Sequence, residues 1–151
     1  MSRASAPARP VIYRNSPIER SRTMNKIEGI YREVIEKSEW LAIATTGPDG
    51  PHLAASWTRY VLALGIDGEE ILIPAGRYEK TGENLQHDPR VELLFAARDV
   101  RRSGGEGQGC SVIGMAELQT TGPKADTAKA KFPWARGVLI VKITGLKTHL
   151  P

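Results

Sequence analysis

The segment that decides the fold is Ile71-Leu72-Ile73-Pro74-Ala75-Gly76-Arg77-Tyr78-Glu79-Lys80-Thr81-Gly82-Glu83-Asn84-Leu85. Its apolar start is too short for a helix and rich in branched side chains, which predicts a buried strand. Pro74 has no N–H to donate within a sheet, so the strand should end there or lie at an edge. Gly76 then allows a sharp bend.

A short helical turn is predicted over Gly82–Gln86, with Thr81 as its cap, Asn84 at its third position and Asp88-Pro89 as its stop. Lys80 lies directly before this cap. An ammonium group, a hydroxyl group and free backbone N–H groups would therefore meet at one point, which suits a phosphate. The alternative is that Lys80 and Thr81 are ordinary surface residues, because a Lys-Thr pair before a helix is common.

The length and composition indicate a single globular domain. The chain has 151 residues, of which 40% are hydrophobic and 25% are charged. No apolar run approaches the roughly 18 residues of a membrane-spanning helix, so no membrane partner is expected. The single cysteine, Cys110, rules out an internal disulfide and a cysteine-built metal site. We therefore expect a cytoplasmic protein.

The net charge of +4 comes from the N-terminal part of the chain. Residues 1–22 contain five arginines and one glutamate, which leaves 16 basic and 16 acidic residues from residue 23 onward. A neutral body argues against a nucleic-acid partner, since such modules present a basic face. We expect residues 1–23 to be a flexible basic extension and residues 24–151 to be one domain.

A hairpin is predicted after a helix over residues 24–38. Trp40–Thr46 forms its first strand, residues 47–51 are dense in turn residues, and the second strand starts at His52. One side of this second strand is small or hydroxylated: His52, Ala54, Ser56, Thr58 and Tyr60. That side could receive a flat group, or it could simply face solvent.

The remaining pattern predicts a mainly β fold with short α-helices. Further strands are expected over Val91–Arg98, Cys110–Gln119 and Gly137–Thr144, and a helix should run from Thr121-Gly122-Pro123 to Lys131. The glycine-rich residues 99–109 precede a strand rather than a helix, so we interpret them as a flexible hairpin loop. Six short antiparallel strands with two or three helices indicate a small closed barrel.

The sequence offers little chemistry of its own. The three histidines show no metal-ligand spacing, so no metal site is predicted. There is no nucleophile elbow and no paired-carboxylate signature, so no catalytic residue can be named. If the protein catalyses a reaction, a cofactor carries the chemistry.

The order of these pieces resembles the split-barrel FMN-binding family related to pyridoxamine 5′-phosphate oxidase, and within it the small FMN-binding proteins of sulfate-reducing bacteria. The resemblance covers about residues 24–150. The residues that carry it are Ala42-Ile43-Ala44-Thr45, Asp49-Gly50-Pro51-His52-Leu53, Trp57, Tyr60, Pro74, Gly76, Lys80-Thr81, Asn84, Arg90-Val91, Gly109, Thr121-Gly122-Pro123 and Trp134-Ala135-Arg136.

The resemblance implies a six-stranded antiparallel split β-barrel that forms a homodimer with FMN at the interface. Carried over by position, the cofactor-binding residues would be Ser56, Trp57, Thr58, Pro74, Ala75, Gly76, Lys80, Thr81, Asn84 and Trp134. Lys80 and Thr81 would hold the phosphate, and Trp134 could reach the ring from the partner subunit. Arg77 and Ala55 depart from the family pattern at the rim of this site.

Three functions are compatible with that resemblance. The first is an electron carrier or small oxidoreductase that exchanges electrons with a redox partner or a small-molecule reductant. The second is a pyridoxamine-phosphate-oxidase-like enzyme, which would need a second phosphate pocket over the flavin. The third is a non-enzymatic FMN storage or sensor protein.

Overall fold

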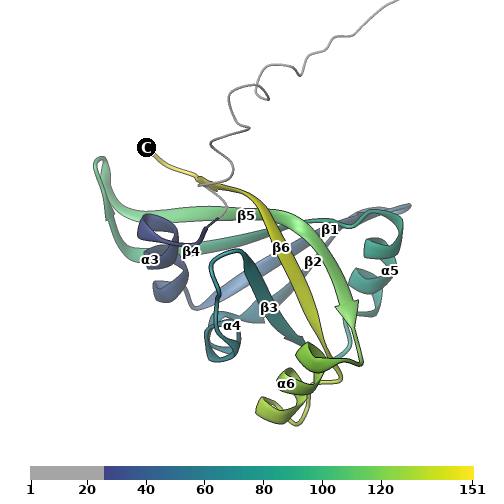
Figure 1. Ribbon diagram of the computed structural model, residues 1–151. Coiled ribbons are helices and arrows are strands. Elements are labelled where there is room, and N and C mark those ends of the chain that lie inside the picture. Colours follow the sequence, from purple (N-terminus) through teal and green to yellow (C-terminus); the bar gives the residue numbers. More distant parts are fainter. Residues whose placement is uncertain (1–25) are drawn as a thin grey trace, which may run out of the picture.

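One antiparallel sheet organises the computed structural model, which describes residues 26–151 (Figure 1). Its strands follow the order β2-β1-β4-β5-β6-β3. They are β1 (Trp40–Gly47), β2 (Gly50–Trp57), β3 (Glu70–Ala75), β4 (Arg90–Arg102), β5 (Gly105–Gln119) and β6 (Gly137–Thr148). The sheet curves into a half-barrel, and its two edge strands, β2 and β3, are not hydrogen-bonded to each other. This confirms the six-stranded split barrel that the family resemblance implies, and it corrects the closed barrel that the strand pattern alone indicated.

Within residues 26–151, four short helices accompany the sheet, one more than the upper limit predicted. They are α3 (Gly29–Lys37), α4 (Thr58–Leu64), α5 (Glu79–His87) and α6 (Pro123–Lys131). Figure 1 shows α5 and α6 at opposite sides of one end of the sheet. None of the helices in residues 26–151 is long and apolar enough to cross a membrane.

The core lies inside the curve of the sheet. Its largest fully buried side chains are those of Phe95, Ile35, Leu41, Ile43, Ile71, Ile73, Leu93 and Leu139. Alternate residues of β4 are buried and exposed, which is the pattern of a strand with one face on the core. The predicted edge position of Pro74 is correct, since β3 pairs only with β6.

Several predicted elements have different bounds in the structure. Helix α3 begins at Gly29 and leaves out residues 26–28 of the predicted helix, because the Ile27 N–H donates to the Gly68 carbonyl at 2.9 Å and holds the chain outside a helix. The glycine-rich residues 99–109 mostly continue β4 and β5, which pair as far as Arg102 and Gly105. The predicted N-terminal extension lies outside the described residues.

The second strand of the hairpin is also shorter than predicted. It ends at Trp57, and residues 58–64 form α4. The Thr58 N–H donates to the Glu39 carbonyl at 3.1 Å, and the Thr58 hydroxyl lies 3.1 Å from the Ser38 hydroxyl. These contacts turn Thr58 inward and end the strand.

Gly137, at the start of β6, lies in close contact with the backbone of Gln119, and this contact can be tested. A Cβ atom there would lie 2.3 Å from the Gln119 carbonyl oxygen, whereas a Cβ atom at Gly145 on the same strand would meet only Ile113 at 3.8 Å. We expect Gly137→Ala to lower the free energy of unfolding by about 1–3 kcal/mol through overpacking. Gly145→Ala is the matched control and should change it by less than about 1 kcal/mol. Equal denaturation midpoints for the two variants would contradict the tight contact.

Candidate functional site

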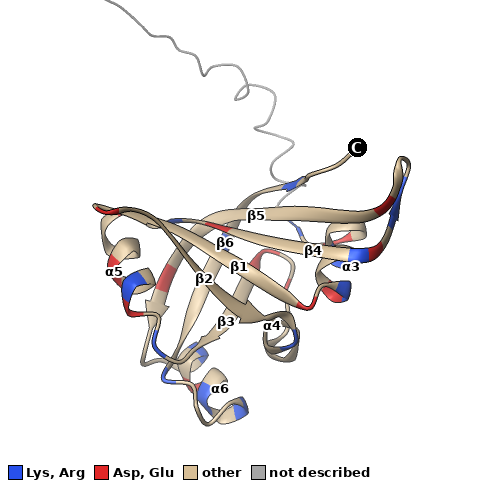
Figure 2. Cartoon of the chain, turned by 180° about the vertical axis from the view of Figure 1, so that it is seen from behind, with Lys and Arg blue, Asp and Glu red and all other residues tan. Residues whose placement is uncertain are grey.

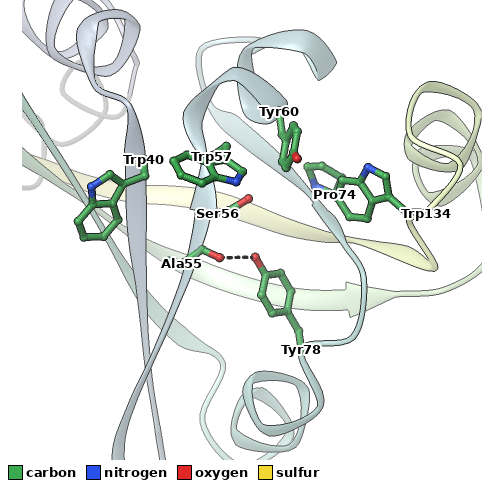
Figure 3. A pocket seen from close by; sticks show the side chains of 8 residues that line it. All are labelled: Trp40, Ala55, Ser56, Trp57, Tyr60, Pro74, Tyr78 and Trp134. Carbon is green, nitrogen blue, oxygen red and sulfur yellow. Dashed lines mark hydrogen bonds between the residues drawn. The ribbon is translucent and has the colours of Figure 1, made fainter.

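A groove of about 720 Å³ lies between the unpaired edges of the sheet (Figure 3). This volume is in the range of sites for small molecules and cofactors. Its lining is mostly aromatic and apolar: Trp40, Ala55, Ser56, Trp57, Tyr60, Pro74, Tyr78 and Trp134. The groove therefore offers flat apolar walls with few polar groups.

All three tryptophans of the chain line this groove. Their exposed fractions are 53% for Trp40, 47% for Trp57 and 46% for Trp134. Tryptophan is usually well buried in folded proteins. Three half-exposed indoles around one hollow therefore form a surface for a planar aromatic ligand.

The tryptophans reach the groove from different parts of the fold. Trp40 and Trp57 lie opposite each other in the register of β1 and β2. Trp134 follows α6, and its ring lies 5.2 Å from that of Tyr60 and 5.5 Å from that of Phe132. Trp134 also covers Gly76, whose Cβ position lies 3.8 Å from the indole. Trp134 thus lines the groove of its own chain.

The hydroxyl groups of the groove are few and belong to Ser56 of β2, Tyr60 of α4 and Tyr78 of the turn after β3. The Tyr78 hydroxyl donates to the Ala55 carbonyl at 3.1 Å, which Figure 3 shows as a link across the groove. Burial raises the pKa of Tyr78, and the neighbouring Ser56 hydroxyl partly opposes that shift. Tyr78 is therefore a neutral hydrogen-bond donor at physiological pH.

The first turn of α5 lies next to the groove and carries Lys80. Its ammonium forms an ion pair with Asp49 of the β1–β2 turn, with 2.8 Å between Nζ and Oδ2. This contact lowers the pKa of Asp49 and raises that of Lys80, chiefly through the hydrogen bond between them. Both groups are solvent-exposed, so a ligand anion can compete with Asp49 for Lys80.

Thr81 differs from its predicted role as a helix cap. Helix α5 begins at Glu79, its N-cap is Tyr78 in a left-handed conformation, and Thr81 is already inside the helix. The Thr81 side chain is 1% exposed, and its Oγ1 has no hydrogen-bond partner among the described residues. An unpaired buried hydroxyl is costly, so a ligand that satisfies it gains that energy.

Two other predicted residues face the interior of the protein. Asn84 is 1% exposed and donates to the Thr45 hydroxyl at 3.2 Å. It packs so closely on Gly47 that a Cβ atom there would lie 2.0 Å from Asn84 Oδ1. The Thr58 hydroxyl is hydrogen-bonded to the Ser38 hydroxyl. The side chains of Asn84 and Thr58 therefore support the site from the protein interior and do not line the groove.

The structure brings most of the predicted residues to one place. Ser56, Trp57, Pro74 and Trp134 line the groove, Ala75 and Gly76 continue from Pro74, and Lys80 and Thr81 follow on α5. Sequence reasoning missed Trp40 and Tyr78 as lining residues, but it placed Tyr60 on the side of the predicted strand that could receive a flat group. The hairpin register could have revealed Trp40, because it pairs with Trp57. No sequence signal marks Tyr78.

A match to a family model accounts for this arrangement. Residues 27–146 match the model described as pyridoxamine 5′-phosphate oxidase. The chain belongs to the pyridoxamine 5′-phosphate oxidase family. It is also 36% identical, over 124 residues, to the FMN-binding protein of Nitratidesulfovibrio vulgaris. The aligned region covers 82% of this chain and 99% of that protein.

Several solved structures share this fold at low sequence identity. HupZ of Group A Streptococcus has a TM-score of 0.61 and 19% identity, covering 82% of this chain and 99% of its own. A putative pyridoxamine 5′-phosphate oxidase of Lactobacillus delbrueckii has a TM-score of 0.58 and 19% identity, covering 82% and 94%. An FMN-binding protein of Syntrophomonas wolfei has a TM-score of 0.53 and 16% identity, covering 80% and 88%. These likenesses support the split-barrel fold.

Proposed function

We propose that this protein binds FMN in the groove and acts as an electron carrier or small oxidoreductase. The observation that carries the proposal is the set of three half-exposed tryptophans around one groove, next to a helix start that holds a lysine and an unsatisfied hydroxyl. Two FMN-binding proteins among the relatives agree with it. A flavin has a planar ring and a terminal phosphate, which match the two ends of this site.

The aromatic end of the groove fits the isoalloxazine ring. Trp57 and Trp134 supply flat surfaces, and Pro74 of β3 lines the groove with them. The half-buried Ser56 hydroxyl supplies a polar contact. Enclosure by these side chains would exclude water from the ring.

The start of α5 fits the phosphate. Lys80 would exchange its contact with Asp49 for the phosphate, and the Thr81 hydroxyl would gain a hydrogen-bond partner. Free N–H groups at a helix start add to the attraction for an anion. Ala75, Gly76 and the inward-facing Thr58 and Asn84 would keep these groups in place.

The composition of the groove favours electron transfer over acid–base chemistry. The ionisable groups among its lining residues are Tyr60 and Tyr78, and no lysine or arginine lines it. A pyridoxamine-phosphate-oxidase-like activity would need a second phosphate pocket, for which the lining has no cation. When bound, FMN would supply the redox chemistry, while the chain binds and shields it.

The first test identifies the ligand and its phosphate contact. We expect a yellow protein that releases FMN, found by mass spectrometry. Lys80→Ala should weaken FMN binding about thirtyfold, the loss of one charge-assisted hydrogen bond, and should leave riboflavin binding nearly unchanged. Lys124→Ala is the matched control, because Lys124 forms an ion pair with Glu70, also at 2.8 Å, outside the groove. Released FAD or heme, or equal loss of both flavins in Lys80→Ala, would refute the assignment.

The second test concerns the tryptophans. An indole held against a flavin ring quenches its emission, so bound FMN should be nearly non-fluorescent. Trp57→Phe should restore much of this emission and weaken binding by roughly 1 kcal/mol through lost stacking. Trp134→Phe should do the same more weakly. If emission stayed quenched in both variants, other residues would have to lie beside the ring.

The outer face of the sheet supports assembly as a homodimer. Strands β1 and β2 carry no charged residue, and Figure 2 shows them without red or blue. Their outward side chains lie in register with those of β4, so Trp40, Ala42, Leu53, Trp57 and Leu94 form one apolar face. Leu53 is 70% exposed and Leu94 is 40% exposed. An apolar face of this kind is typical of an interface.

The charges beside this face are suited to two-fold pairing. Glu92 and Lys147 line a shallow hollow with Leu53 and Leu94. Neither has an ion-pair partner within residues 26–151. In a two-fold dimer, a patch that contains both charges can pair with its own copy. Because Trp40 and Trp57 belong to both the face and the groove, the partner subunit would border the flavin site.

The dimer is tested by placing a charge on the apolar face. Leu53→Glu should yield a monomer in light scattering, since two glutamates would be buried together at the interface. Because Leu53 is highly exposed in the single chain, the variant should keep its fold, which circular dichroism can check. Ala130→Glu, on the exposed side of α6, is the control and should remain dimeric. A Leu53→Glu variant that stays dimeric would place the interface elsewhere.

A further inference from the structure

Tyr78 has an unusual backbone conformation beside the proposed site. Its φ and ψ angles are 53° and 43°, and it is the one non-glycine residue with positive φ in residues 26–151. A bulky aromatic residue disfavours this left-handed region. Such conformations persist where surrounding contacts impose them, and they cluster at functional sites.

The contact that accompanies this conformation crosses the open edge of the sheet. Strand β2 has β1 as its only sheet neighbour, so its outer carbonyl groups lack a strand partner. The Tyr78 hydroxyl donates to one of them, the Ala55 carbonyl, at 3.1 Å. In Figure 3 the Tyr78 ring rises from the turn before α5 to Ala55, below Ser56. Tyr78 thus ties the start of α5 to the strand that carries Ser56 and Trp57.

Three side-chain contacts hold α5 and its preceding residue to the β1–β2 hairpin. They are Tyr78 to the Ala55 carbonyl, Lys80 to Asp49, and Asn84 to Thr45. If Lys80 turns to a ligand phosphate, its contact with Asp49 is lost. Asn84 then links the middle of the helix to the hairpin, and the Tyr78 hydroxyl is the remaining side-chain hydrogen bond from the helix start to the hairpin among the described residues.

We propose that Tyr78 is a positioning residue that fixes the distance between the ring-binding wall of β2 and the phosphate-binding start of α5. This inference rests on the proposed FMN function. A ligand with both a ring and a phosphate needs that distance to be fixed, whereas riboflavin needs only the ring wall. Tyr78 therefore adds to the preference for a flavin monophosphate without contacting the phosphate.

The test compares FMN and riboflavin binding to Tyr78→Phe, which keeps the ring and removes the hydroxyl. We expect the dissociation constant of FMN to rise about fivefold, the effect of one neutral hydrogen bond, and that of riboflavin to change less than twofold. Tyr31→Phe, on α3 and outside the groove, is the matched control and should change neither. Hydrogen exchange of residues 76–81 in the ligand-free protein should become faster in Tyr78→Phe only.

A double-mutant cycle with Lys80→Ala separates positioning from direct contact. In the Lys80→Ala background, Tyr78→Phe should weaken FMN binding less than it does in the wild-type protein, because the start of α5 then holds the phosphate less tightly. Equal weakening of FMN and riboflavin, no weakening of either, or additive effects of the two variants would overturn the role of Tyr78. Should Tyr78→Phe fold poorly, Tyr78→Asn tolerates the left-handed backbone and must show the same discrimination. A wild-type protein that binds neither flavin would instead refute the proposed function itself.

Discussion

The site depends on two strands that do not pair. Pro74 removes a backbone donor from β3, and Thr58 turns the chain into α4 as soon as β2 ends. Neither strand can therefore complete the barrel through a regular ladder of hydrogen bonds. The opening is lined by aromatic side chains, and Tyr78 satisfies one carbonyl of the exposed β2 edge. A sheet that closed fully would have no groove at this position.

Helix α5 connects this opening to the stability of the fold. Its Thr81 hydroxyl is buried without a partner, which costs about 1–3 kcal/mol in a typical protein. A ligand that supplies the missing partner binds the folded state only, so binding and folding stability are coupled. The close packing of Asn84 on Gly47 keeps the helix near the hairpin in spite of this cost.

Local sequence signals predicted the strands well because their causes are local. The turn residues between Thr46 and His52 produced the expected hairpin, and Asp88-Pro89 ended α5 after His87. The errors came from distant contacts. The alternation from His52 to Tyr60 suggested a long strand. The strand instead ends at Trp57, because the Thr58 hydroxyl is hydrogen-bonded to the Ser38 hydroxyl. The preference of threonine for helix caps suggested Thr81 as the cap. The helix instead starts earlier, at Glu79, and its N-cap is Tyr78 in a left-handed conformation, which propensity does not predict.

The arrangement of the groove required the sheet order as well as the strands. Pairing of β6 with β3 sets Gly137 beside Ala75, and this brings Trp134 over Gly76 although the two are far apart in sequence. The hairpin register independently sets Trp40 opposite Trp57. Because these last two side chains also lie on the apolar outer face, a ligand that covers one side of the indoles leaves the other side for a second chain. Ligand binding and assembly would then draw on the same residues, so each should strengthen the other.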